Sequence, residues 1–257
     1  MKKLILTIFC LGVFSVNAQG VMALFEAETE SIPTFNSVMD FWMSAVKTGM
    51  EMDDAKMYVF REQGTKNLKL VQWFDSKKAM IEHMDKQEAS QEKIQAAMKE
   101  MTPMEEGTFE KFGETTDFKE ASVWEYMPEL STTPETWSPL TKEERDEYKY
   151  RRVQFIDVKM NNDKAFEDNT KKQNELDKKL GIKYHLAVFK SVFGARDADY
   201  IVVLLDKSRF EYHKNWDERM KVRNVNDEWK EFMKADNLSK WSVMGESNWN
   251  RINKMTY

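Results

Sequence analysis

From Val21 onward, the first half of the chain has alternating apolar residues, followed by apolar residues at helical spacing. Ser31 and Pro33 mark the start of the predicted helix, and Gly49 marks its end. The alternating residues, which share one face of a predicted strand, are Val21, Ala23, Phe25 and Ala27. The helical stripe, which predicts one buried face, consists of Ile32, Phe35, Val38, Met39, Trp42, Ala45 and Val46.

A hairpin, a second helix and a last strand complete the first half. Gly64 lies between two runs rich in β-branched and aromatic residues, which is the pattern of a hairpin. Asp75 or Ser76 is placed to cap a long second helix, whose apolar side includes His83. The predicted strands after the first lie at residues 57–61, 68–74 and 108–112.

The second half of the chain repeats this order of elements. A helix is predicted from about Asp163 to Leu180, and the spacing of Ser208 and Glu211 predicts a capping box at the start of another. The predicted strands lie at residues 153–158, 184–192, 200–205 and 238–244. Each half therefore has the order βαββαβ, the ferredoxin-like arrangement of an antiparallel sheet with two helices on one face, and the predicted fold class is α+β.

Matching landmarks recur in the same order in both halves, at an offset of about 130 residues, which indicates a duplication. The matching positions are Phe25 and Phe155, Gly49 and Gly181, Gly64 and Gly194, Asp75 and Asp206, His83 and His213, and residues 113–115 and 245–247. Pro128, Pro134 and Pro139 lie in a stretch between the halves that breaks the periodic pattern. The predicted boundaries are 19–127 for the first repeat, 128–147 for the linker and 148–257 for the second repeat.

The amino terminus has the pattern of a secretory signal peptide. Lys2 and Lys3 precede an unbroken apolar stretch, and Ala18 is suited to cleavage by a signal peptidase. The apolar stretch is shorter than the roughly 20 residues of a membrane-spanning helix, so no membrane anchor is expected. We predict that residues 1–18 are removed and that the mature protein is exported to the periplasm or the extracellular space.

The charge and the cysteine content limit the classes of partner and of reaction that are expected for this chain. The only cysteine, Cys10, lies in the predicted signal peptide, so the mature chain would have neither a disulfide nor a thiol nucleophile. That chain would have 37 basic and 44 acidic residues in mixed order, which disfavours nucleic acid as a partner. The charged run at residues 171–179 is predicted to be solvated surface. No phosphate loop, dinucleotide fingerprint, nucleophile elbow or His-Glu-x-x-His motif is present, and no cofactor or metal site is predicted.

A short motif stands where the third predicted strand meets the second helix. The strand ends in aromatic residues, an Asp-Ser turn follows, and the helix has an Ala-Met-x-x-His pattern, over residues 71–76 and 79–83. Residues 206–213 are a looser second copy. The motif and the order of elements resemble those of the dimeric α+β barrel superfamily, which includes antibiotic-biosynthesis-type monooxygenases, NIPSNAP-like proteins and haem-degrading monooxygenases.

The resemblance implies a barrel made of two ferredoxin-like units that pack sheet against sheet. Members usually form it as homodimers, whereas here both units lie in one chain, so we expect a monomer with a pseudo-dimer core. The linker would hold the two units at an effective concentration of about millimolar. Haem-degrading members have an Asn on the first strand and a His farther along the second helix, where this chain has Glu26, Glu28 and Lys93, which disfavours haem.

Two histidines are the candidate catalytic residues. His83 and His213 occupy equivalent positions on apolar helix stripes, where an imidazole could act as a general base near neutral pH. The alternative is that both are half-buried structural histidines. Large apolar side chains could line a pocket for an apolar or aromatic ligand. The candidate ligand-binding residues are Phe25, Trp42, Trp73, Met80 and Trp216.

These features leave four functions open. The leading prediction is an exported small-molecule-binding protein of the dimeric α+β barrel type, with an apolar or aromatic ligand. The alternatives are a cofactor-independent monooxygenase-like enzyme that uses His83 or His213, and a structural or protein-binding module. A minor alternative is copper handling by methionines together with His83, since thioether sulfur selects Cu(I). Methionine is also a common filler of apolar cores.

Overall fold

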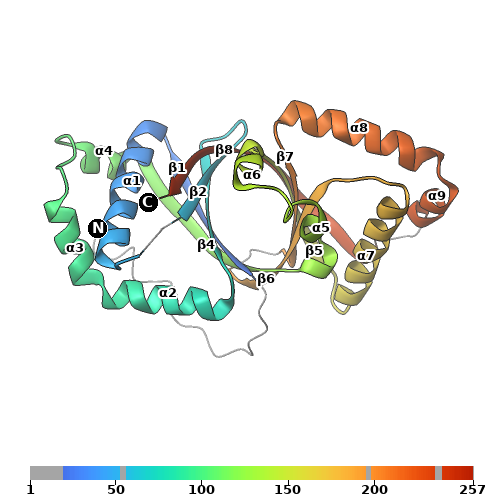
Figure 1. Cartoon of the computed structure of the whole chain (residues 1–257), viewed down its shortest axis with the longest axis horizontal. Coiled ribbons are helices and arrows are strands. Elements are labelled where there is room, and N and C mark those ends of the chain that lie inside the picture. The colour runs from blue at the N-terminus through green and yellow to red at the C-terminus, as the bar shows by residue number, and fades with distance from the viewer. Residues whose placement is uncertain (1–19, 53–55, 195–197, 235–238, 257) are drawn as a thin grey trace.

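The computed structural model describes residues 20–52, 56–194, 198–234 and 239–256. The predicted signal peptide lies outside these ranges, so its removal stays a prediction. The first half of the chain shows a strand, a helix and a hairpin, then three helices and a fourth strand (Figure 1). Its elements are β1 (Val21–Thr29), α1 (Ile32–Gly49), β2 (Lys56–Glu62), β3 (Asn67–Phe74), α2 (Lys77–Ala89), α3 (Gln91–Glu100), α4 (Thr108–Thr115) and β4 (Thr116–Tyr126).

The predicted linker contains short helical segments, and the second unit follows it. The segments are η1 (Pro128–Leu130), α5 (Thr133–Thr136) and α6 (Lys142–Glu147). The elements of the second unit are β5 (Tyr150–Val158), α7 (Asp163–Lys179), β6 (His185–Phe193), β7 (Tyr200–Asp206), α8 (Arg209–Val225), α9 (Asp227–Met233) and β8 (Trp241–Thr256). None of the helices in the described ranges is both long and apolar enough to span a bilayer.

The strands form one closed antiparallel barrel in the order β1-β3-β2-β8-β5-β7-β6-β4. Each unit contributes four neighbouring strands in the ferredoxin-like order. Strand β2 pairs with β8, and β4 pairs with β6, so two hydrogen-bonded seams join the units. The helices of the first unit lie on one side of the barrel and those of the second unit on the other (Figure 1). The predicted fold, two ferredoxin-like units closing a barrel within one chain, is confirmed.

Large side chains fill the middle of the barrel, and the two units contribute matching ones. The indole Nε1 of Trp124 in β4 donates to Ser122 Oγ at 2.8 Å. The indole Nε1 of Trp249 in β8 donates to Ser247 Oγ, also at 2.8 Å. The buried residues of this cluster are Met22, Leu24, Phe60, Trp124, Val153, Ala187, Phe189, Ala198, Ile201, Val203 and Trp249. Their burial stabilises the closed barrel, at about 25 cal/mol for each Å² of apolar surface removed from water.

The other face of each strand packs against a helix layer, because successive side chains point to opposite sides of a sheet. Phe25 and Ala27 of β1 belong to the same buried cluster as Phe35 of α1, as the predicted stripe requires. In the second unit, the rings of Phe166 in α7 and Tyr200 in β7 lie 4.5 Å apart. Each unit therefore has its own helix–sheet core, and both units share the barrel interior.

The predicted helix starts and the predicted hairpin turn are confirmed. Ser31, Ser76 and Ser208 cap α1, α2 and α8, and each side chain accepts a hydrogen bond from the backbone N–H three residues later. The cap of α2 is therefore Ser76 and not Asp75. Gly64 has φ of +82°, a left-handed conformation that glycine adopts without strain, between β2 and β3.

The last strand of the first unit was predicted at residues 108–112, and this is wrong. These residues lie in α4, and β4 begins only at Thr116. Phe109 and Phe112 are three residues apart, a spacing that places both on one side of a helix. Their rings lie 5.7 and 6.0 Å from phenylalanine rings of α1. Packing against α1 therefore decides the helical conformation of this segment.

The last strand of the second unit is longer than the predicted residues 238–244. Strand β8 runs over Trp241–Thr256 because it pairs with β5 of its own unit and then with β2 of the other. The proposed match of residues 113–115 with 245–247 is also wrong, since the first segment is helical and the second lies in β8. The Ser-x-Trp sequences of β4 and β8 are the structural equivalents.

Gly49 at the end of α1 provides a test of how tightly α1 packs on α3. A Cβ atom at Gly49 would lie 2.5 Å from the backbone nitrogen of Ile94. Backbone cannot move aside as the end of a flexible side chain can, so we expect Gly49→Ala to lower the free energy of unfolding by about 1–3 kcal/mol. Urea denaturation measures this change.

The matched control is Gly113→Ala in α4, where an added Cβ would meet no atom within 4 Å. Alanine favours a helix over glycine by about 1 kcal/mol, so this variant should be as stable as the wild type or slightly more stable. Equal destabilisation by both substitutions would contradict the close contact between α1 and α3.

Candidate functional site

The structure does not bring the five candidate ligand-binding residues together. Phe25 and Trp42 pack in the helix–sheet core of the first unit. Met80 lies half-buried on α2, and Trp73 lies at one end of the barrel on β3. Trp216 lies on α8 in the second unit. Of these residues, Trp73 and Trp216 have substantial exposed surface, 44% and 38%.

The two candidate catalytic histidines have different surroundings. His83 on α2 is half-buried, and its ring centroid lies 5.3 Å from that of Phe74. Burial, followed by the positive charge of Lys86, lowers the pKa of His83, so its imidazole is neutral at physiological pH. His213 on α8 is exposed and contacts the ring of Tyr212 at 5.2 Å. Of the two, only His83 is placed as a desolvated neutral base.

The surface of the described part of the molecule has shallow grooves, including two with the following linings. One, of about 370 Å³, lies between α7 and α9 and is lined mainly by charged residues such as Lys172 and Glu175. The other, of about 350 Å³, lies beside the β2–β3 turn at Gly64, with Asn250 and Ile252 of β8. Neither groove includes a candidate residue from the sequence. Side chains fill the middle of the barrel, so exposed apolar surface at its ends is of interest for an apolar ligand.

An aromatic cluster, here called the aromatic end, consists of Trp73, Tyr126 and Phe189. Trp73 of β3 meets Tyr126 of β4 and Phe189 of β6 edge to face, at ring-centroid distances of 5.7 and 6.1 Å. Tyr126 and Phe189 lie 5.6 Å apart. Phe189 is 6% exposed, so Trp73 offers most of the open aromatic surface. Strands β3 and β4 belong to the first unit and β6 to the second, so the cluster exists only in the closed barrel.

The segment that links the two units is held to this end of the barrel by hydroxyl groups. The Tyr126 hydroxyl lies 2.6 Å from Thr133 Oγ1 at the start of α5. At the other end of α5, Thr136 Oγ1 lies 3.0 Å from His185 Nδ1 on β6. Helix α5 therefore bridges a strand of the first unit and a strand of the second unit.

His185, which was not among the predicted site residues, lies among aromatic rings. Its ring centroid is 5.4 Å from Trp137 and 4.8 Å from Tyr148, both in edge-to-face contact. Burial, followed by the positive charge of Arg151, lowers the pKa of His185 to about 4. No motif surrounds this histidine in the sequence. Its aromatic neighbours, Trp137 and Tyr148, lie in the segment between the two units, far from it along the chain.

The lowered pKa of His185 predicts a dependence of stability on pH. An unfolded histidine titrates near pH 6.5, so between about pH 6.5 and 4 the unfolded state binds the proton that the folded state excludes. Stability should therefore fall as the pH is lowered through this window. We expect His185→Gln to lose less free energy of unfolding than the wild type between pH 7 and pH 4.5, measured by urea denaturation. Parallel pH profiles of the two proteins would contradict this assignment.

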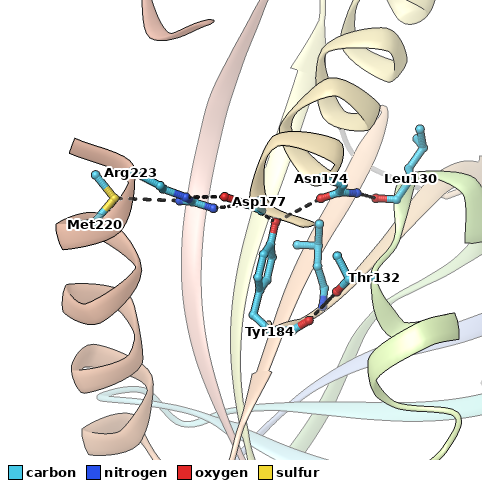
Figure 2. A network of polar contacts seen from close by, with 8 residues as sticks. Leu130, Thr132, Asn174, Asp177, Tyr184, Met220 and Arg223 are labelled. Carbon is cyan, nitrogen blue, oxygen red and sulfur yellow. Dashed lines mark hydrogen bonds and ion pairs between the residues drawn. The ribbon is translucent and has the colours of Figure 1, made fainter. Parts of the chain in front are cut away.

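A buried ion pair joins α7 to α8 in the second unit (Figure 2). Arg223 Nε donates to Asp177 Oδ1 at 2.8 Å, and Nη2 of the same arginine donates to Oδ2. Asp177 is 1% and Arg223 5% exposed. Loss of one partner of such a pair typically costs about 3–5 kcal/mol, since it leaves a buried charge uncompensated. The prediction that residues 171–179 form solvated surface is therefore wrong at Asp177, which faces α8.

Tyr184 and Asn174 extend this ion pair to the linking segment (Figure 2). The Tyr184 hydroxyl donates to Asp177 Oδ2 at 2.8 Å, and Asn174 Nδ2 donates to the Leu130 carbonyl at 2.8 Å. Thr132 Oγ1 donates to the Tyr184 carbonyl. Burial, followed by the negative charge of Asp177, raises the pKa of Tyr184, so the hydroxyl remains a hydrogen-bond donor.

Glu26 and Lys93, which stand where haem-degrading members have an Asn and a His, form ion pairs. Glu26 Oε2 on β1 lies 2.8 Å from Lys69 Nζ on β3, and Lys69 is 6% exposed. Lys93 Nζ lies 2.7 Å from Glu51 Oε1 at the surface. These side chains are engaged in ion pairs and are not the Asn and His of the haem-degrading members.

Metal ligands do not gather in the described residues. Within the ranges described, no group of three or more His, Cys, Asp or Glu side chains is placed to hold a metal ion. The methionines of the first unit pack in apolar clusters, with Met39 and Met43 in the helix–sheet core and Met50 between α1 and α3. Their packing is that of core residues.

Solved structures resemble this chain, although no protein-family model and no curated protein matches it. A protein from Fusobacterium nucleatum, provisionally described as a monooxygenase, aligns with a TM-score of 0.52 at 10% identity, over 93% of this chain and 95% of that one. An anthrone oxidase-like protein aligns with a TM-score of 0.54 at 12% identity, over 93% of each chain. A provisional monooxygenase from Lactobacillus acidophilus aligns with a TM-score of 0.50 at 8% identity, over 93% of this chain and 96% of that one.

At such low identity the likeness shows the fold alone. The chain has the fold of the dimeric α+β barrel superfamily. Both ferredoxin-like units of the barrel come from one chain, as the internal repeat predicted.

Proposed function

We propose that this chain is an exported small-molecule-binding protein that holds an apolar or aromatic molecule at the aromatic end of its barrel. The observation that carries the proposal is the 44% exposure of Trp73 beside Tyr126 and Phe189. The proposed site of action is the periplasm or the extracellular space, on the basis of the signal-peptide pattern at residues 1–18.

The aromatic end combines features that favour an aromatic ligand. Tyr126 and Phe189 hold the Trp73 ring from the side, so a ligand that stacks on the indole meets a surface that is already oriented. Aromatic pairs of this kind contribute about 0.5–1.5 kcal/mol beyond the burial of their area. The Tyr126 hydroxyl is engaged by Thr133, so the surface offered to the ligand is mainly apolar.

Binding of a neutral aromatic probe tests this proposal. N-phenyl-1-naphthylamine is uncharged and becomes fluorescent in apolar surroundings, so it reports occupancy directly. We expect it to bind the wild-type protein, and we expect Trp73→Ala to weaken binding about tenfold, which corresponds to about 1.4 kcal/mol of lost contact.

The matched control is Phe210→Ala, which removes another exposed aromatic side chain, 75% exposed, from α8 of the second unit. This control should bind the probe as the wild type does. If neither Trp73→Ala nor Phe210→Ala changes the affinity, the aromatic end is not the site. If the wild type binds no probe, the structural or protein-binding alternative replaces the proposal.

A second candidate function, cofactor-independent oxygenation, is favoured by the surroundings of His83. Its imidazole is half-buried against Phe74, and its lowered pKa keeps it neutral and able to accept a proton at physiological pH. The fold is compatible with this function, since the similar structures include provisional monooxygenases and an anthrone oxidase-like protein. In such a reaction the histidine would remove a proton from an activated carbon, and dioxygen would oxidise the resulting carbanion.

Oxygen consumption with anthrone tests this second function. Anthrone and one O₂ give anthraquinone and water, which balances the oxidation without another reductant. If the enzyme function is right, His83→Ala should abolish turnover while changing the free energy of unfolding by less than about 1 kcal/mol. Glu88→Gln, an exposed change on the same helix, should keep full turnover. Absence of turnover in the wild type, or full turnover in His83→Ala, would exclude His83 as the base for this substrate.

A further inference from the structure

Arg219 on α8 is a buried cation with two hydrogen-bond donors that find no acceptor. The residue is 6% exposed. Its Nε and Nη2 atoms are buried and have no hydrogen-bond partner within the described part of the chain. Buried polar groups in folded proteins nearly always have a partner, and an unmatched charged donor is especially costly. The unmatched donors of Arg219 therefore indicate that an acceptor from outside the chain completes this region.

The two donors are on one edge of the guanidinium group. Nε–H and Nη2–H are parallel, and this edge matches the two oxygens of a carboxylate. Arg223, one helical turn farther along α8, uses the same edge to hold Asp177 through Nε and Nη2. Arg219 thus offers to an external anion the geometry with which its neighbour holds an internal one.

Aromatic rings fix the orientation of Arg219. Its guanidinium carbon lies 4.8 Å from the ring centroid of Tyr184 and 5.4 Å from that of Trp216. Cation–π contacts with both rings hold the guanidinium beside Tyr184 and Trp216. Trp216 is 38% exposed, so the cluster reaches the surface of the protein at this indole.

The charges around Arg219 also favour an anion. Asp177 compensates Arg223 directly, whereas no ion pair compensates Arg219 within the described residues. Asp206 is the nearby carboxylate that acts on Arg219 through space, and it accepts hydrogen bonds from Asn215 Nδ2 and the Lys207 backbone N–H. Burial, followed by the positive charge of Arg223, lowers the pKa of Arg219.

We propose that Arg219 binds a small carboxylate. Its two oxygens accept hydrogen bonds from Nε and Nη2 of Arg219, and the organic part of the acid lies against Trp216. This site is separate from the aromatic end of the barrel and does not depend on binding there. It lies in the second unit, between α8 and the network of Asp177, Tyr184 and Arg223.

Calorimetric titration with benzoate and with benzamide, at equal ionic strength, tests the carboxylate site. The two probes have the same ring and nearly the same shape, and only benzoate has the charge and the two equivalent oxygens. Benzoate should bind the wild-type chain, and benzamide should bind at least about tenfold more weakly, as expected when charge-assisted hydrogen bonds are lost. Equal affinities for the two probes, or no binding of benzoate, would overturn the proposal.

Substitutions then assign the binding to Arg219. Arg219→Gln should weaken benzoate binding about tenfold or more. Arg219→Lys keeps the charge but lacks the forked edge, so it should also weaken binding, and it decides the question if Arg219→Gln does not fold. Arg209→Gln, an exposed arginine at the start of the same helix, is the control and should bind as the wild type does. Wild-type affinity in Arg219→Lys would overturn the two-oxygen contact.

Discussion

The structure depends on the two seams at which the units pair, β2 with β8 and β4 with β6. An open ferredoxin-like sheet would leave β2 and β4 of the first unit as exposed edges, and the indoles of Trp124 and Trp249 would face water. Closing both seams removes every edge and buries one shared interior. Because one chain supplies both units, the seams form without a concentration-dependent association step.

The two units of the closed barrel differ in where their ion pairs lie. The two units share the order of their strands, but the side chains at corresponding places in the sheet differ. The predicted match of Phe25 with Phe155 is wrong, because Phe25 packs against the helix layer and Phe155 packs in the barrel interior. Phe155 instead has the place of Glu26, since the register shifts directly after each of these two residues. Glu26 pairs in register with Lys69, whereas Phe155 pairs in register with Ile201. The buried ion pair of the second unit lies instead outside the barrel, between α7 and α8. The buried or partly buried ion pairs of the two units thus lie in different layers.

Most of the fold could be predicted from periodicity, since burial of one face imposes alternation in a strand and helical spacing in a helix. The prediction failed at residues 108–112, because a short segment with Phe109 and Phe112 fits either conformation until α1 provides a surface. The extent of β8 also could not be predicted, since its last residues pair with a strand nearly 200 positions earlier in the chain.

The candidate sites could be predicted from the sequence less well than the fold. Trp73 was predicted as a large aromatic side chain that could line a pocket, but Tyr126 and Phe189 surround it only when β4 pairs with β6. Arg219 and Asp177 belong to strongly charged helices, and charge along a helix is normally solvated. Their burial depends on how α7 and α8 approach each other.

The sequence by itself determined the order of the elements, the duplication and the absence of cysteine from the region after residue 18. These properties depend on local spacing and composition. Only the tertiary structure decided which aromatic rings share the barrel end and which arginine lacks an acceptor. Such contacts join residues from different units or different helices, and their energy depends on distances that no local pattern contains.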